Sequence, residues 1–304
     1  MVPNLKILNV GARWLDSRKL NISDVIPASI EHFLLTYRGT ETWSIYQLVE
    51  FLDLHPSLSF LSLPKLEDMM DMDMDITAAP VDWKNQSWPN LRELILDQVD
   101  PERQMKQLVQ YIPSCVFPNL ERLSVNEMPW EETFRPLLSM HGANLKAIQF
   151  AIYEAETGVG VEKAVLETIH ELCPSLEEIG LFSSYMWSDE DARWPEIDKA
   201  FERVTVLVLE LREYRQACGE DWEWFLDNAF RWSRSMLPNV QIIRFIEQDN
   251  WEDLQDVGEY VEVFLRNCGE LGIKVENNFG VQLKLRTLCA GSDGKTDRSS
   301  EWEK

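Results

Sequence analysis

From residue 117 the chain reads Phe117-Pro118-Asn119-Leu120-Glu121-Arg122-Leu123-Ser124-Val125. Pro118 and Asn119 favour a turn, and Leu120 anchors the chain as it leaves that turn. Leu123 and Val125 are the apolar members of an alternating pattern, which is the period of a short strand with one buried face. This stretch therefore predicts a turn followed by a β-strand.

The same pattern, L-x-x-L-x-V or a close variant, recurs along the chain. Neighbouring copies start 25 to 36 residues apart. Self-similarity at such a period indicates a repeat architecture rather than two unrelated domains. The copies begin at Leu5, Ile30, Leu58, Leu91, Leu120, Leu145, Leu176, Val204 and Val240, with a weaker tenth copy at Cys268.

Between the predicted strands the apolar residues follow a helical period. One helical face is formed by Val161, Ala164, Val165, Ile169 and Leu172, another by Leu254, Val257, Val261, Phe264, Leu265 and Cys268, and a third by Met105, Leu108, Val109 and Ile112. A unit of one strand and one helix cannot bury its own apolar face, so neighbouring units must stack. We therefore predict an α/β solenoid, a horseshoe of about nine to ten irregular strand-helix repeats with the strands on the concave side.

The repeats resemble the leucine-rich-repeat superfamily over roughly Leu5 to Val275. The match is nearest to the ribonuclease-inhibitor-like repeats of fungal F-box proteins. Phrases that carry the resemblance are Trp88-Pro89-Asn90-Leu91-Arg92-Glu93-Leu94 and Cys173-Pro174-Ser175-Leu176-Glu177-Glu178-Ile179.

The resemblance implies a non-enzymatic function in protein binding. In that family the repeats hold a target protein, while the F-box docks to the adaptor of a cullin-based ubiquitin ligase. We expect no F-box within this sequence, because Val2-Pro3-Asn4-Leu5 already reads as part of a repeat. Since a solenoid normally needs a cap over its first repeat, we expect the chain to be the C-terminal part of a longer product rather than one whose first repeat is covered by a partner. Residues 1–288 are expected to form the solenoid and residues 289–304 a disordered tail.

Composition narrows the class of partner. The chain carries 29 basic and 52 acidic residues in 304, a net charge of −23. Nucleic acids and anionic membranes would be repelled by such a surface. No apolar run is long enough to span a bilayer, and the N-terminal residues do not form a secretory signal. Five scattered cysteines are typical of a reduced protein, so we expect it in the cytoplasm, the nucleus or both.

No catalytic or cofactor motif occurs. The four histidines are far apart in the sequence, and His55 and His170 near helix ends are expected to be structural. Cys173 and Cys268 are expected in the core. The Gly158-Val159-Gly160 stretch lacks the residues of a phosphate loop and is interpreted as a turn. An enzyme hidden in the solenoid would need a polar cluster that the sequence spacing does not indicate.

The segment 67–82 is rich in Asp and Met. Asp71, Asp73, Asp75 and Asp82 match ligand positions of a calcium loop, but Ile76 stands where that loop needs glycine. We therefore predict no metal site and interpret the segment as a solvated loop, which a partner with a basic patch could still contact.

Large aromatic residues follow several predicted strands at similar distances. Trp14, Trp130, Trp187, Trp251 and Tyr214 lie 9 to 11 residues after the start of their repeats, just past the strand. They predict either a binding rim, since such residues are enriched at hot spots, or a roof over the apolar layer.

The concave face should carry the residue between the two inward positions of each strand, namely Asn9, Leu34, Ser62, Ile95, Ser124, Gln149, Gly180, Val208 and Arg244. This mixture suits a broad protein contact. Candidate contact residues are the aromatic rim together with Asp97, Glu210 and Arg244. The alternative is a free-standing repeat scaffold or inhibitor with no link to ubiquitin transfer.

Overall fold

The structure is a computed structural model that describes residues 5–11, 26–36, 45–63, 87–96, 117–125, 131–154, 159–160, 163–183, 194–211, 219–246 and 258–282. Within these residues, ten parallel strands lie side by side in chain order. They are β1 (Ile7–Gly11), β2 (His32–Thr36), β3 (Phe60–Leu63), β4 (Glu93–Leu96), β5 (Arg122–Val125), β6 (Ala147–Glu154), β8 (Glu178–Ser183), β9 (Val206–Leu211), β10 (Ile242–Ile246) and β11 (Lys274–Asn277).

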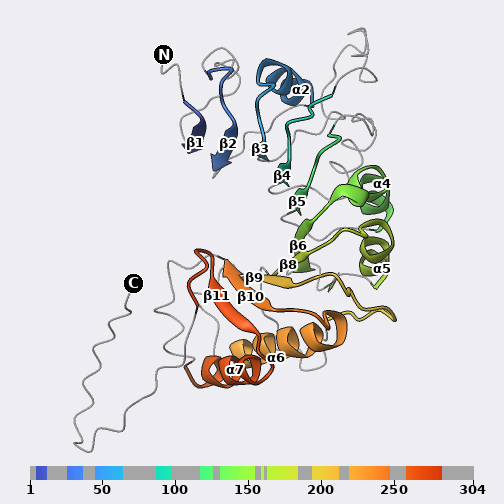
Figure 1. The fold of residues 1–304 in the computed structure, drawn as a ribbon, viewed down its shortest axis with the longest axis vertical. Helices are drawn as coiled ribbons and strands as arrows, with labels where there is room; N and C mark the ends of the chain where they lie inside the picture. The colour runs from blue at the N-terminus through green and yellow to red at the C-terminus, as the bar shows by residue number, and fades with distance from the viewer. Residues whose placement is uncertain are drawn as a thin grey trace, which may run out of the picture.

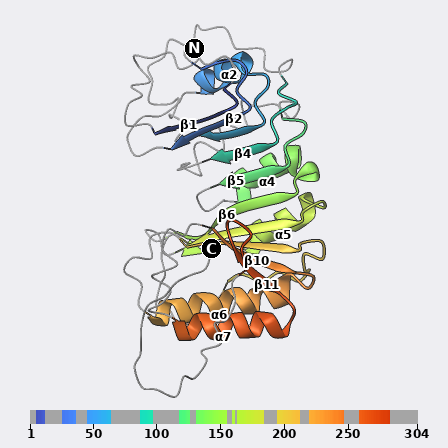
Figure 2. The same cartoon turned by 60° about the vertical axis from the view of Figure 1, so that its left-hand side comes forward.

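The helices lie on one face of this sheet. Figure 1 shows the strands along an arc with the helices on its outer side, and Figure 2 shows α6 and α7 next to each other at the C-terminal end. The predicted α/β class is confirmed, and a curved, all-parallel sheet is compatible with a solenoid. The helices are α2 (Ile45–Leu54), α4 (Glu131–His141), the 3-10 turn η4 (Gly142–Asn144), α5 (Lys163–Leu172), α6 (Gly219–Met236) and α7 (Gly258–Glu270).

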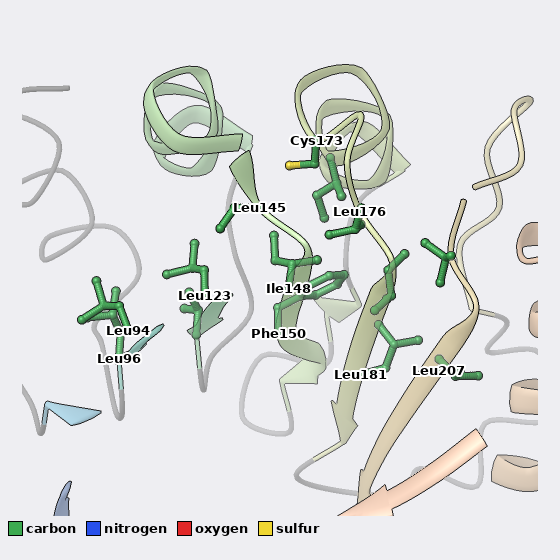
Figure 3. Close-up of a cluster of buried hydrophobic side chains, with 14 of the residues drawn as sticks. Leu94, Leu96, Leu123, Leu145, Ile148, Phe150, Cys173, Leu176, Leu181 and Leu207 are labelled. Atoms are coloured by element: carbon green, nitrogen blue, oxygen red, sulfur yellow. The ribbon is translucent and has the colours of Figure 1, made fainter. Parts of the chain in front are cut away.

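The strand register places the predicted inward positions in rows across the sheet. The first row is Leu8, Phe33, Leu61, Leu94, Leu123, Ile148, Ile179, Leu207, Ile243 and Val275. All of these except the partly buried Leu8 are buried in the core. Figure 3 shows Leu123 and Ile148 side by side, with Leu145 and Cys173 nearer the helices. The core is thus a continuous apolar layer between the strands and the helices.

A recurrent turn leads into the strands. The backbone N–H of Leu120 donates to the carbonyl of Phe117 at 3.2 Å, and that of Leu176 donates to Cys173 at 3.2 Å. Equivalent bonds precede six more strands, at Ile30, Leu58, Leu91, Leu145, Val204 and Val240. The Pro-Asn-Leu phrases therefore mark turns, as the sequence predicts.

The asparagine of these phrases has a further role that the sequence did not indicate. Asn119 Nδ2 donates to the carbonyl of Pro89 at 2.8 Å, which belongs to the preceding turn. The same bond joins Asn90 to Pro56, Asn144 to Pro118 and Asn239 to Glu202. Each of these asparagines therefore links its own turn to the preceding turn by a hydrogen bond.

Two sequence predictions are corrected by the strands. The tenth copy was placed at Cys268, but α7 continues to Glu270, and Gly272 with φ +73° forms the turn. The strand that follows pairs Val275 with Ile243, so the expected alignment was wrong by four residues. Val159 and Gly160 form the short strand β7, antiparallel to the end of β6, rather than a plain turn.

The predicted helical faces are confirmed where they are described. Val165 and Ile169 of α5 are fully buried. In α7, Phe264 and Cys268 are buried, while Val261 and Leu265 pack against the core. The third predicted face lies outside the described residues, as do Val161, Leu254 and Val257.

Candidate protein-binding face

Most of the predicted contact residues cannot be placed on a surface. Trp14, Asp97, Trp130, Trp187, Tyr214 and Trp251 lie outside the described residues, and Glu210 lies in β9 with its side chain outside them. Among the predicted contact residues, Arg244 of β10 alone has a described side chain. The binding rim therefore stays a prediction.

Three other tryptophans have described side chains, and all three are buried. Trp88 Nε1 donates to Asp53 Oδ1 at 3.1 Å, and Trp232 Nε1 donates to the carbonyl of Pro195 at 2.7 Å. Trp194 packs edge-on against Trp232 with ring centroids 6.0 Å apart. These three tryptophans belong to the hydrophobic core.

The face of the sheet opposite the helices is formed by two further rows of residues, which we call the inner face. One of these two rows contains the residues predicted for the concave side, from Asn9 to Arg244, and it continues to Glu276. Because strands alternate with period two, the residues two positions earlier share this face. That second row is Ile7, His32, Phe60, Glu93, Arg122, Ala147, Glu178, Val206, Ile242 and Lys274.

Four charged residues form an ion-pair network over the C-terminal part of the inner face. Arg122 of β5 donates to both carboxylate oxygens of Glu178 of β8, at 2.9 and 3.3 Å. The strand between them carries only the small Ala147 at this register position, which leaves room for the contact. Arg244 Nη1 lies 3.6 Å from Glu178 Oε2, and Arg244 Nη2 lies 2.7 Å from Glu276 Oε1. The network therefore runs from β5 to β11.

Within this network, the two arginines and the two glutamates neutralise each other's charges. Burial lowers the pKa of Arg122, but the hydrogen bond and the charge of Glu178 outweigh it and raise the pKa overall. Arg244 keeps 30% of its side chain exposed while bonded to Glu276. A partner that uses Arg244, as the sequence predicts, must compete with these carboxylates.

The middle of the inner face is closed by its own side chains. A Cβ atom on Gly180 would lie 2.3 Å from Gln149 Cγ, so the glutamine side chain crosses directly over this glycine. Gly180 and its register neighbour Val208 are both buried. Glycine at this point of β8 is thus required by the close approach of Gln149.

The N-terminal part of the inner face is different, and we call it the β1–β4 patch. Its eight members are Ile7, His32, Phe60 and Glu93 in one row and Asn9, Leu34, Ser62 and Ile95 in the other. Ile7 is 66% exposed, and Leu34, Phe60 and Ile95 are half-buried. His32 stacks on Phe60 with ring centroids 5.8 Å apart.

Glu93 is the one acidic residue of the patch. Burial raises the pKa of its carboxyl, an effect that the charges of Arg122 and His32 oppose and the charge of Glu178 reinforces. Within the described ranges, no hydrogen bond or ion pair engages this carboxylate. Its nearest cationic strand neighbour, Arg122, is turned to Glu178 by two hydrogen bonds.

The sequence contains a signal for these charged residues that the prediction did not use. Glu93, Arg122 and Glu178 precede the predicted middle position of their strands by two residues. Period two alone places them on the same face as that position. The distances between them depend on strand order and on side-chain direction, which spacing does not provide.

Among the described residues, no three His, Cys, Asp or Glu side chains converge on one point. Burial raises the pKa of both Cys173 and Cys268 to about 12, which keeps these thiols protonated. Both lie in the core as predicted, and the candidate calcium ligands Asp71, Asp73, Asp75 and Asp82 are not part of what the structure describes.

His55 and His170 lie near helix ends, as predicted. His170 packs against a neighbouring segment, since its Nε2 lies 3.2 Å from the carbonyl oxygen of Ala200. His55 directly follows α2 and is buried beside Phe51 of that helix, with ring centroids 4.5 Å apart, and neither of its ring nitrogens has a hydrogen-bond partner among the described residues.

The fold and this face define an α/β protein with a curved parallel sheet, one face covered by helices and the other formed by side chains in register. No protein-family model matches the chain, and neither does any curated protein. None of the described helices has both the length and the apolar character needed to cross a membrane.

Proposed function

We propose that this chain is a leucine-rich-repeat solenoid whose inner face binds a protein target without catalysing a reaction. The observation that carries the proposal is the register of ten parallel strands, which aligns two rows of side chains on the face opposite the helices. A long, mixed apolar and polar surface suits a protein partner better than a small molecule.

The proposal extends to substrate recognition in an F-box and cullin type of ubiquitin ligase. Support for this step comes from the repeat phrases such as Cys173-Pro174-Ser175-Leu176, which resemble those of fungal F-box proteins. The net charge of −23 favours a partner with basic character over nucleic acid or an anionic membrane. The cytoplasm or the nucleus would be the place of action.

The alternative is a scaffold or inhibitor unconnected to ubiquitin transfer. Affinity purification of the endogenous product from its native cells, followed by mass spectrometry, separates the two. Co-purification of the cullin-ligase adaptor, with residues ahead of Met1 in the product, supports the ligase function. A product that begins at Met1 and brings down no ligase subunit contradicts it and leaves the scaffold function.

Binding through the inner face needs its own test. Lys274 is an exposed inner-face residue of β11, whereas Glu177 is an exposed residue that precedes β8. For a basic target that binds the C-terminal part of the inner face, Lys274→Glu should strengthen binding about tenfold, because it replaces a repulsive charge by an attractive one, and Glu177→Gln should leave the Kd within about twofold. Equal affinity for inner-face variants at both ends would refute the proposed face.

A further inference from the structure

The two ends of the inner face differ in how their charges are satisfied. From β5 to β11, Arg122, Glu178, Arg244 and Glu276 neutralise one another through the ion-pair network. In the β1–β4 patch, Glu93 forms no ion pair among the described residues, although the charges of Arg122 and His32 act on its carboxylate, and half-buried apolar side chains lie near it. The patch therefore offers a partly buried carboxylate that no described side chain engages in an ion pair.

The register defines what surrounds this carboxylate. Glu93 pairs with Phe60 on one side and with Arg122 on the other. Ile95, two residues further along β4, pairs with Ser62, whose neighbour on β2 is Leu34. A cation paired with Glu93 would therefore lie between the Phe60 ring on one neighbouring strand and the Arg122 side chain on the other.

We propose that the β1–β4 patch binds a segment of a partner protein that presents a lysine or arginine between apolar side chains. The cationic group pairs with Glu93, and its hydrocarbon stem together with the flanking residues covers Phe60, Leu34 and Ile95. This inference rests on the proposed function and deepens it, because it assigns the binding end and the chemistry of the target.

Three physical arguments favour this occupant. A cation at Glu93 compensates a carboxylate whose burial raises its pKa. Arginine and lysine also interact favourably with aromatic faces, and the Phe60 ring lies on the neighbouring strand. The net charge of −23 steers cationic segments toward the chain and increases their association rate.

The same charges disfavour three other possible ligands of the β1–β4 patch. A second copy of the chain carries the same net charge of −23 and would be repelled at long range. An anionic ligand would meet Glu93 without a free counterion, because the Arg122 guanidinium is bonded to Glu178. Purely apolar segments would bury the carboxylate unpaired, which is costly.

The test uses a library of short random peptides selected against the full chain. The selected peptides should contain a lysine or arginine flanked by apolar residues. For a representative peptide, Glu93→Gln should raise the Kd about tenfold or more, since a charge-assisted hydrogen bond is lost. The matched control Glu177→Gln makes the same chemical change at an exposed residue outside the patch and should leave the Kd within about twofold.

Exchanging the two charges distinguishes loss of the ion pair with Glu93 from misfolding of the variant. Glu93→Lys should abolish binding of the basic peptide and restore binding of the same peptide with its basic residue replaced by glutamate. Peptides without a basic residue, or a basic peptide that binds Glu93→Gln as tightly as the wild type, would overturn the inference. So would a dimer of the chain, seen by sedimentation, that Glu93→Gln dissociates.

The binding measurements give different results when only this inference is wrong and when the proposed function is wrong. If Lys274→Glu strengthens peptide binding and Glu93→Gln leaves the Kd unchanged, the inner face binds at its other end, and the inference alone is wrong. If neither variant changes the Kd of any selected peptide, the inner face is not the binding surface, and the proposed function is wrong with it.

Discussion

At the residue scale, buried histidines link the stability of the fold to pH. His141 ends α4, is 3% exposed and packs on Phe117 with ring centroids 5.8 Å apart. Burial lowers its pKa to about 4 from the model-peptide value of 6.5, although the Phe117 backbone opposes this shift. The folded protein therefore favours the neutral ring.

The sign of the pH dependence follows from this shift. As the pH falls below 6.5, the unfolded chain takes up a proton that the folded chain resists, so the free energy of unfolding decreases until the pH reaches about 4. The full loss is about 3 kcal/mol for His141. His55, whose pKa is also lowered by burial, acts in the same direction.

We predict that His141→Leu makes the free energy of unfolding less dependent on pH between 6.5 and 4. Urea unfolding followed by circular dichroism at several pH values measures this dependence. Leucine cannot be protonated, so the contribution of about 3 kcal/mol from this site should disappear. A variant as sensitive to acid as the wild type would show that His141 titrates normally in the folded chain.

At the element scale, stacked turns and close contacts between neighbouring elements hold the strands in register. Asn119 in the turn before β5 donates from Nδ2 to Pro89 in the turn before β4. We predict that Asn119→Ala lowers the free energy of unfolding by about 1 kcal/mol through loss of this hydrogen bond. Ser57→Ala, at the equivalent place of the turn before β3, is the control and should change stability by less than about 0.5 kcal/mol.

Thermal and urea unfolding of both variants test the role of the asparagine. Equal stabilities of Asn119→Ala and Ser57→Ala would mean that the exposed bond is replaced by water without cost. Asn119→Ser, which keeps a shorter donor, should fall between alanine and the wild type.

The contact between η4 and the end of α5 is another element-scale constraint. A Cβ atom on Gly142 would lie 2.6 Å from the carbonyl oxygen of Leu172 and 3.1 Å from Cys173 Sγ. We predict that Gly142→Ala costs about 1 to 3 kcal/mol, because a backbone carbonyl cannot move aside freely. Gly269→Ala in α7 has open space around its Cβ and should stabilise the chain by up to about 1 kcal/mol. Similar effects in both variants, measured by thermal unfolding, would contradict the steric argument.

The sequence predicted the elements much better than the contacts across them. Alternation identified the strands, because each strand has one buried face, and Leu123 and Val125 show this in β5. The tenth strand was misplaced because its turn uses Gly272 in place of the usual apolar anchor. The ion pair between Arg122 and Glu178 spans 56 residues, and only the three-dimensional stacking of strands brings them together. A binding face is therefore harder to predict than the repeats that build it.

At the scale of the whole molecule, sequential stacking determines how far a local change is felt. The strand order follows the chain order, so β1 and β11 lie at opposite ends of the sheet. In such an array, stability is close to a sum of terms for each unit and for its contacts with its neighbours. The effect of a core lesion should therefore decrease with distance along the stack.

Phe264 tests this property at the C-terminal end. Its ring lies 6.0 Å from Phe245 of β10 and 6.4 Å from Phe230 of α6, measured between ring centroids. We predict that Phe264→Ala, which leaves a cavity worth about 3 to 5 kcal/mol, lowers hydrogen-exchange protection in α6, α7, β10 and β11. The amides of β2 and β3 should keep their protection.

The matched lesion at the other end is Phe33→Ala, whose ring packs 4.9 Å from Phe51 of α2. It should loosen β1, β2, β3 and α2 while α6 and α7 stay protected, which is the reverse pattern. Uniform loss of protection along the chain in both variants would show one cooperative unit and would contradict the stacked description. Opposite, localised losses would instead mean that the β1–β4 patch and the ion-pair network are stabilised separately, so that a ligand at one end protects mainly its own neighbours.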